Sequence, residues 1–215
     1  MQFIFEQVRV GGDRNFGYLI GDRKAGEGIL IDPSYSPETL VERAQAQKLR
    51  ITHILNTHGH GDHSNGNIGA RERTGAKVYA GSGAGGDVTL KDGSTIKVGA
   101  YDVHVLHVPG HCPDHLVYYI QDMKVGITGD LLFVGKVGGT HTETDGRTEW
   151  DSLQRLLREW PDDTTIWPGH DYGARPSTTM ALEKATNPFL LCADIEAFLK
   201  LKQDWADFKA DNGLK

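Results

Sequence analysis

The chain has 215 residues, of which 38% are hydrophobic and 24% are charged, and its formal net charge is −6 at pH 7. This profile is typical of one globular domain, and the negative charge argues against nucleic acid as a partner. The chain contains only two cysteines, too few for a disulfide framework. Its first residues meet Glu6 and Arg9 early, unlike a signal peptide, and no later segment approaches membrane-spanning length. We therefore expect a cytoplasmic protein without a nucleic-acid or membrane partner, and a homodimer stays compatible with this composition.

Short apolar segments bounded by turn residues predict a chain rich in strands. Strands are expected over residues 3–10, 16–21, 28–31, 51–55, 77–80, 95–98, 101–108, 116–120, 125–128 and 164–167. One helix is expected to begin at Pro37 after the N-cap Ser36, because proline is favoured at the first helical position. Further helices are expected over 65–74 and 149–160.

Two glycine-rich segments are expected to be loops, and the tail is expected to be helical. Residues 81–86 match the G-x-G-x-x-G pattern, but β-like alternation follows instead of a helix, which favours a loop over a nucleotide site. Residues 134–147 form a glycine-rich segment that is expected to be a loop. In the tail, apolar residues recur at spacings of three and four from Ile195 to Phe208, which predicts one amphipathic helix that packs on the core.

The segment from Thr57 to His63, with the pattern H-x-H-x-D-H, follows an apolar strand and precedes a helix. His58 and His60 are two residues apart and point the same way in extended chain. The glycines between the histidines let the backbone turn, so Asp62 and His63 can face a second point nearby. Imidazole and carboxylate groups are ligands for zinc, iron and manganese. A histidine-rich surface loop or a tag is the alternative, but a tag would be terminal and would not carry the interleaved aspartate and glycines.

Three later residues share one sequence context. His111, Asp130 and His170 each follow an apolar strand and stand directly after glycine. Strand ends that meet at one edge of a sheet are where open sheets place their sites. A lone histidine is usually structural, but together with the H-x-H-x-D-H segment these residues predict a metal centre.

This combination resembles the metallo-β-lactamase superfamily, and its order and glycine context are most similar to the type II glyoxalases (hydroxyacylglutathione hydrolases). The resemblance extends over about residues 15–172. It implies an α/β (α+β) fold, a four-layer αββα sandwich of two mixed sheets. Residues 1–175 would form the catalytic domain, and residues 176–215 a short C-terminal helical extension packed on the same domain.

The resemblance also implies a dinuclear site with two divalent metal ions, for which zinc is favoured and iron or manganese are alternatives. The implied ligands are His58, His60 and His111 for one metal and Asp62, His63 and His170 for the other, with Asp130 bridging both. Asp62 and Asp130 would be the catalytic carboxylates. Asp32 would orient a ligand histidine, and His115 would act likewise.

The implied reaction is hydrolysis of a small thioester or ester, in which a metal-bridging hydroxide attacks the carbonyl carbon. No side-chain nucleophile is required, so Cys112 is not assigned a role in catalysis. The glyoxalases hold glutathione with a lysine and a tyrosine, but the corresponding positions here are Gly139 and His141, and the tail is shorter than their helical domain. The candidate substrate contacts are Lys136, His141, Arg147, Tyr172 and Arg175.

Other functions on the same scaffold remain open. A mononuclear iron persulfide dioxygenase would use His58, His111 and Asp130. Those enzymes typically carry an arginine-threonine-aspartate segment, whereas residues 136–140 here read Lys-Val-Gly-Gly-Thr. A lactonase or a β-lactamase is a third alternative, and a non-catalytic metal-binding module is a fourth, although an open dinuclear set exceeds what a structural role requires.

Overall fold

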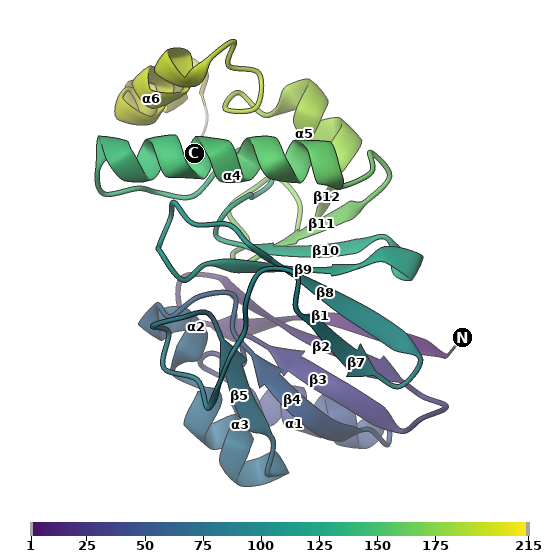
Figure 1. Ribbon diagram of the computed structural model, residues 1–215. Coiled ribbons are helices and arrows are strands. Elements are labelled where there is room, and N and C mark those ends of the chain that lie inside the picture. Colours follow the sequence, from purple (N-terminus) through teal and green to yellow (C-terminus); the bar gives the residue numbers. More distant parts are fainter. Residues whose placement is uncertain (1, 214–215) are drawn as a thin grey trace.

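The computed structural model describes residues 2–213 and contains two mixed β-sheets that lie face to face, with helices on both outer sides (Figure 1). This arrangement confirms the expected αββα sandwich. The strands alternate inward and outward side chains, so each sheet can bury one face against the other sheet and its second face against helices.

The amino-terminal half builds the first sheet. Its strands lie in sequence order: β1 (Phe3–Gly11), β2 (Asn15–Asp22), β3 (Glu27–Ile31), β4 (Arg50–Leu55), β5 (Lys77–Ala80) and β6 (Val88–Thr89). β1, β2 and β3 pair antiparallel, whereas β3 to β6 pair parallel. Helices α1 (Pro37–Ala46) and α3 (Asn67–Thr74) connect parallel strands and pack on the outer face through Leu40, Val41 and Ala70.

The strands of the second sheet also lie in sequence order. Its strands are β7 (Thr95–Val98), β8 (Tyr101–His107), β9 (Leu116–Ile120), β10 (Val125–Gly129), β11 (Thr165–Pro168) and β12 (Thr178–Thr179). A short 3-10 helix (Gln121–Met123) turns the chain between β9 and β10. Only β10 and β11 pair parallel, and their connection contains α4 (Glu143–Glu159), which covers the outer face with Leu153 and Leu156.

A hydrophobic core fills the space between the two sheets. Tyr18, Ile20 and Ile29 from the first sheet meet Val105 and Tyr118 from the second, and all five side chains are fully buried. Since this core locks the sheets together, the strand ends of both sheets are held at fixed positions along one edge.

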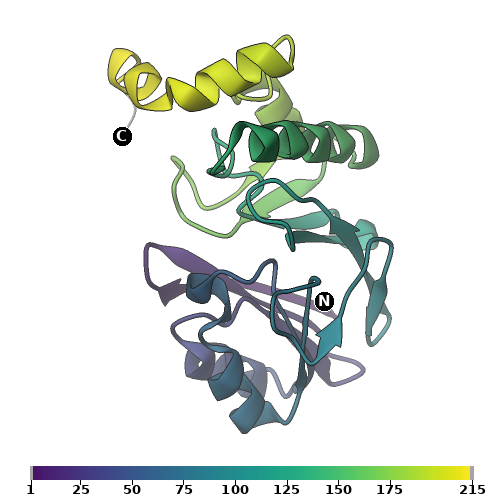
Figure 2. The ribbon, with the colours of Figure 1, turned by 60° about the vertical axis from the view of Figure 1, so that its left-hand side comes forward.

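Three helices follow the second sheet: α5 (Met180–Thr186), α6 (Ile195–Gln203) and α7 (Trp205–Asp211). Figure 2 shows the yellow carboxy-terminal helices lying across the outer side of the green helix α4. The fully buried Phe198 of α6 packs against Trp150 of α4. The division of the chain at residue 175 stays a prediction.

The structure corrects two helix boundaries. α4 begins at Glu143 and not at residue 149, so the glycine-rich loop is shorter than expected. The reason is a capping box: the Thr142 hydroxyl accepts from the Asp145 backbone N–H, and the Asp145 carboxylate accepts from the Thr142 N–H. The tail helix is interrupted at Asp204, which ends α6 and begins α7.

Within residues 2–213, no helix has both the length and the apolar character that crossing a membrane requires.

Candidate metal centre

The H-x-H-x-D-H segment brings its first two histidines together with His111. His60 Nδ1 lies 3.0 Å from His58 Nε2 and 3.1 Å from His111 Nε2. The turn between His58 and His60 is held by Asp114, whose Oδ2 accepts from the Gly59 backbone N–H at 2.6 Å. Three ring nitrogens therefore converge on one point, as the sequence predicts for the first ligand group.

The second group forms where the short helix α2 (Gly61–Ser64) meets the end of β11. His63 Nε2 and His170 Nε2 are 3.2 Å apart, and Asp62 Oδ2 lies 3.6 Å from the first and 3.4 Å from the second. His63 and His170 are buried, whereas the Asp62 side chain keeps about a third of its surface exposed.

Asp130 lies between the two groups. Its Oδ2 is 3.7 Å from His111 Nε2 and 3.3 Å from His170 Nε2. Its Oδ1 is 3.4 Å from His63 Nε2. One buried carboxylate thus faces both sets of ring nitrogens.

Hydrogen bonds at the outer ring nitrogens show that these residues suit a metal. His58, His63, His111 and His170 donate from Nδ1 to Thr57 Oγ1, Asp32 Oδ2, the Gly139 carbonyl and the Asp13 carbonyl, respectively. Once its Nε2 is deprotonated, each ring therefore presents the lone pair of that nitrogen to the centre. Facing lone pairs repel unless a cation lies between them, and Asp130 Oδ1 is buried without a hydrogen-bond partner within residues 2–213. Tetrahedral coordination at about 2.1 Å spaces ligand atoms by about 3.4 Å, close to the distances observed.

The electrostatics of the two groups differ. Burial would lower the pKa of His63, but the carboxylates of Asp130 and Asp32 raise it well above its usual value. Burial would also lower the pKa of His170, but hydrogen bonds with Asp130 and Asp62 raise it to about 9. In the metal-free protein, protons on His63 and His170 thus balance the negative charge of the neighbouring carboxylates. A divalent cation bound between these residues would balance the same charge. At His58 burial dominates and lowers the pKa.

Asp32 and His115 both support the centre, but in different ways. Asp32 follows β3 and accepts hydrogen bonds from the Thr57 backbone N–H at 2.8 Å and from His63 Nδ1 at 3.0 Å. His115 does not orient a ligand histidine as expected: its Nε2 accepts from the Asp130 backbone N–H at 3.0 Å. Burial lowers the pKa of His115 to about 3, so the ring stays neutral and able to accept.

Sequence reasoning missed several residues that support the centre. Asn15 Nδ2 donates to Asp62 Oδ2 at 3.0 Å, and the Asp13 carbonyl accepts from His170. Asp13 lies in the turn between β1 and β2 and Asn15 begins β2, so both are far from their partners in the chain. Asp114 lies within the Cys-Pro-Asp-His segment, but no local pattern connects its carboxylate to Gly59.

The five predicted substrate contacts have different environments. Lys136 and His141 line a pocket of about 800 Å³ between residues 136–143 and the helices α6 and α7. Arg147 pairs with Glu143 and Glu196, and Arg175 is exposed. The Tyr172 ring stacks on His170 with centroids 4.5 Å apart, and its hydroxyl donates to Asp13 Oδ2.

Cys112 is buried, and its sulfur lies within 4.8 Å of ligand nitrogens of His58 and His60. Burial raises the pKa of the thiol, and the nearby Asp114 adds to this rise. A protonated thiol is a poor nucleophile and a poor ligand at neutral pH.

Comparison with known proteins agrees with the fold. Residues 10–87 and 81–170 match the Metallo-beta-lactamase superfamily, and the chain belongs to this superfamily. A hydroxyacylglutathione hydrolase of Polaromonas sp. is 36% identical over 177 residues, which cover 79% of this chain and 67% of the relative. A hydroxyacylglutathione hydrolase of Rhodospirillum rubrum is 35% identical, over 82% of this chain and 69% of the relative. The chain thus spans about two thirds of the length of these two hydrolases. The predicted resemblance to hydroxyacylglutathione hydrolases is confirmed.

The chain is also similar to persulfide dioxygenases. The mitochondrial persulfide dioxygenase ETHE1 of Homo sapiens is 32% identical, over 86% of this chain and 75% of the relative. The crystal structure of ETHE1 from Myxococcus xanthus superposes with a TM-score of 0.84 at 32% identity and covers 94% of this chain and 91% of that one.

Proposed function

We propose that this chain is a dinuclear metal-dependent hydrolase that cleaves a small thioester or ester. The observation that carries the proposal is the position of Asp130, whose Oδ2 lies 3.7 Å from His111 Nε2 and 3.3 Å from His170 Nε2. A carboxylate between two groups of histidine nitrogens can bind both of two adjacent divalent ions. Zinc fits the donor set, as do iron and manganese.

In this proposal His58, His60 and His111 hold one ion, while Asp62, His63 and His170 hold the other. When bound, such a pair of ions polarises a carbonyl group and lowers the pKa of water towards neutrality. The chain's own contribution is orientation. Asp32 fixes the His63 ring, and His115 fixes the backbone of Asp130.

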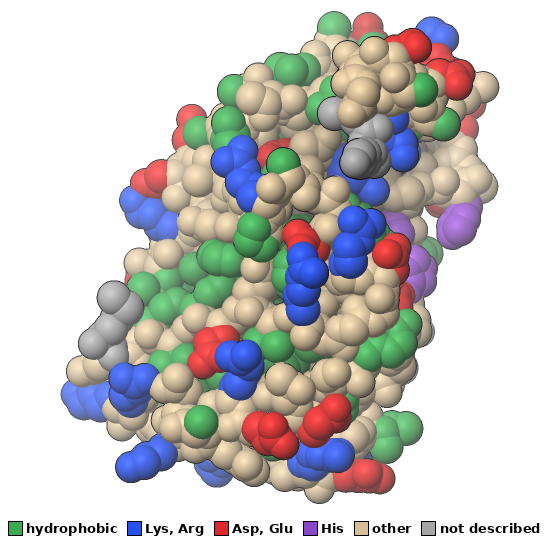
Figure 3. Space-filling view, turned by 180° about the vertical axis from the view of Figure 1, so that it is seen from behind, with side chains coloured by type: hydrophobic (Ala, Val, Ile, Leu, Met, Phe, Trp, Pro, Cys, Tyr) green, Lys and Arg blue, Asp and Glu red, His purple; other side chains and the backbone are tan. Residues whose placement is uncertain are grey.

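The pocket beside the centre supports a small organic substrate. It adjoins the first ligand group, because Gly139 lines the pocket and its carbonyl accepts from His111 Nδ1. Lys136 Nζ lies 4.4 Å from the centroid of the Tyr172 ring, so this cation packs on an aromatic ring. Figure 3 shows histidine side chains reaching the surface at one edge, with Lys or Arg side chains beside them. We infer that Lys136 attracts the anionic part of the substrate.

A mononuclear iron persulfide dioxygenase is the second candidate, and two observations favour it. His58, His111 and Asp130 alone form a group that can hold one ion. The chain also covers 91% of the Myxococcus xanthus ETHE1 structure.

Metal analysis paired with two assays tests the proposal. We expect about two metals per chain and hydrolysis of S-lactoylglutathione that a chelator abolishes. Because the lysine and tyrosine of the glyoxalase clamp are replaced, we expect a high KM for this substrate. Replacing Lys136 with Met should raise KM about tenfold or more, since a charge-assisted bond contributes about 1.5–3 kcal/mol.

Lys91→Met, at an exposed position outside the predicted substrate contacts, is the matched control for Lys136→Met. One iron per chain, together with persulfide-dependent oxygen consumption and no thioester hydrolysis, would replace the first candidate by the second. A low micromolar KM for S-lactoylglutathione alone would show that a different clamp recognises glutathione.

A further inference from the structure

A buried ion pair joins α4 to α6 behind the metal centre. Glu149 of α4 is fully buried, and the Lys202 side chain of α6 is 12% exposed. The Lys202 ammonium donates to Glu149 Oε2 and also to the Gly138 carbonyl at 2.7 Å. Burial raises the pKa of Glu149 to about 7, and Lys202 opposes this rise. Removing two charges from water is costly, and neither side chain belongs to the two ligand groups.

The peptide that Lys202 contacts leads directly to a ligand candidate. Gly139 follows Gly138, and its carbonyl accepts from His111 Nδ1 at 2.7 Å. A Cβ on Gly138 would lie 2.1 Å from the Asp130 carbonyl oxygen and 3.2 Å from His111 Cβ. The peptide is therefore confined on two sides, by Asp130 and by His111.

Glu149 also confines the residue before His111. Gly110 has a φ of +143°, and a Cβ there would lie 2.4 Å from the Glu149 Cα. The α4 backbone at Glu149 thus supports the segment that carries His111, while the Glu149 carboxylate holds Lys202. The hydrogen bond from His111 to Gly139 lies between these two supports.

We propose that Lys202 is a positioning residue for His111: by holding the Gly138–Gly139 peptide, it sets the carbonyl that fixes the tautomer and orientation of the His111 ring. A histidine ligand depends on the group that binds its outer nitrogen, because that bond fixes which nitrogen carries the lone pair. The inference rests on the proposed role of His111 as a metal ligand. It makes α6 part of the metal centre, so docking of α6 and binding at the His58–His60–His111 group favour each other.

A purely structural role for the Glu149–Lys202 pair would affect metal binding only through the stability of the fold. Buried ion pairs can often be replaced by apolar side chains without loss of stability, whereas removal of one partner is destabilising. The double variant Lys202→Met/Glu149→Leu therefore restores packing but leaves the Gly138 carbonyl without its ammonium donor. If Lys202 positions His111, this variant regains stability but keeps a lowered metal affinity. If the pair has only a structural role, stability and metal affinity both return.

The experiment measures metal affinity by chelator competition and follows the His111 ring by nitrogen NMR in the metal-free protein. Lys202→Met should weaken one of the two metal sites by about tenfold, the lower end of what loss of a ligand's hydrogen-bond partner costs. Lys202→Met should also shift the nitrogen signals of the His111 ring. This shift would not occur if the Glu149–Lys202 pair only held α6 in place. The double variant should regain the stability of the wild type and keep the weakened site.

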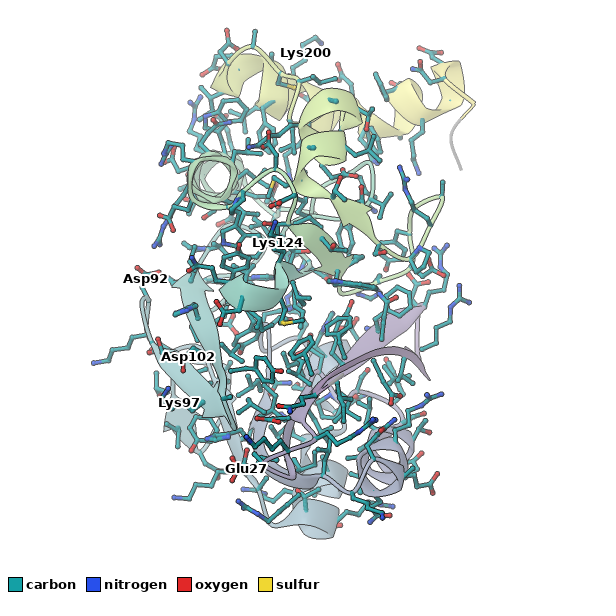
Figure 4. The ribbon with its side chains drawn as sticks, turned by 90° about the vertical axis from the view of Figure 1, so that its right-hand side faces the viewer. Glu27, Asp92, Lys97, Asp102, Lys124 and Lys200 are labelled. Atoms are coloured by element: carbon teal, nitrogen blue, oxygen red, sulfur yellow. The ribbon has the colours of Figure 1, made fainter. Side chains whose placement is uncertain are left out.

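Lys200→Met is the matched control, because Lys200 lies on the same helix (Figure 4), is 78% exposed and pairs with Asp204 at the end of that helix. It should bind both metals as the wild type does. Wild-type affinity in Lys202→Met, or affinity that returns with stability in the double variant, would overturn the positioning role. A wild-type protein that binds no metal would instead refute the proposed function.

Discussion

At the residue scale, the metal centre depends on which nitrogen of each histidine faces inward. Thr57, Asp32, the Gly139 carbonyl and the Asp13 carbonyl each bind an Nδ1–H, so the four Nε2 atoms face the centre. The Asp130 carboxylate is in contact with both groups, and the proposal of two ions depends on it.

Replacing Asp130 with Asn tests this dependence. The amide removes the negative charge that both ions would share, so metal content and turnover should fall together, with each affinity reduced by at least about tenfold. Metal analysis and thioester kinetics measure the two effects. Asp102→Asn is the control, because Asp102 is an exposed carboxylate that pairs with Lys97 (Figure 4). Full metal occupancy and near-native turnover in Asp130→Asn would show that Asp130 is not a bridge.

At the element scale, α4 combines two tasks. Its inner face covers the second sheet with Leu153 and Leu156, and its Glu149 supports the segment around His111. The capping box at Thr142 decides where α4 begins, and therefore where the loop from residue 134 ends. That loop supplies both Gly139 and one wall of the pocket.

Thr142→Ala should lower the free energy of unfolding by about 0.5–2 kcal/mol, because the Asp145 backbone N–H loses the hydroxyl that accepts its hydrogen bond. Urea denaturation of the metal-free protein measures this loss. Thr144→Ala, at an exposed position in the first turn, should change stability by less than about 0.5 kcal/mol. Equal effects of the two substitutions would mean that the cap does not stabilise α4.

At the scale of the whole molecule, the two sheets are joined by polar bonds as well as by the apolar core. Asp22 at the end of β2 accepts from the Ala100 backbone N–H at 2.9 Å, in the turn between β7 and β8. This N–H, with those of Lys24 and Ala25, lowers the pKa of the Asp22 carboxyl. A lowered pKa in the folded protein means that ionised Asp22 stabilises the fold above the unfolded pKa of about 3.9.

Replacing Asp22 with Asn should therefore destabilise the protein by roughly 1 kcal/mol at pH 7, with a difference that shrinks as the pH falls below about 4. The sign follows because protonation of the wild-type carboxyl removes the same charge that the amide removes. Urea denaturation in the presence of a chelator, at several pH values, measures this difference. Asp122→Asn, at an exposed position, serves as control. A difference for Asp22→Asn that stays constant from pH 7 to about 3 would contradict the assignment.

The amino-acid sequence by itself determined the family and most of the strands, because these depend on local patterns. It also indicated seven candidate ligands, whose role as ligands stays a prediction. Alternating apolar residues specify strands, and a histidine or aspartate after a strand and a glycine is placed at the strand end without knowledge of the partner. Helix boundaries were less accurate: α4 begins six residues before the expected position, since its apolar pattern starts later than its capping box.

Only the tertiary structure decided which groups surround those ligands. Asp13 meets His170, Asn15 meets Asp62, and Lys202 meets the Gly138 carbonyl through contacts between distant segments. His115 was expected to orient a ligand histidine, whereas the fold places it against the Asp130 backbone. The physical reason is that a hydrogen bond depends on position and direction within a few tenths of an ångström, and packing of the two sheets and of α6 on α4 sets these positions.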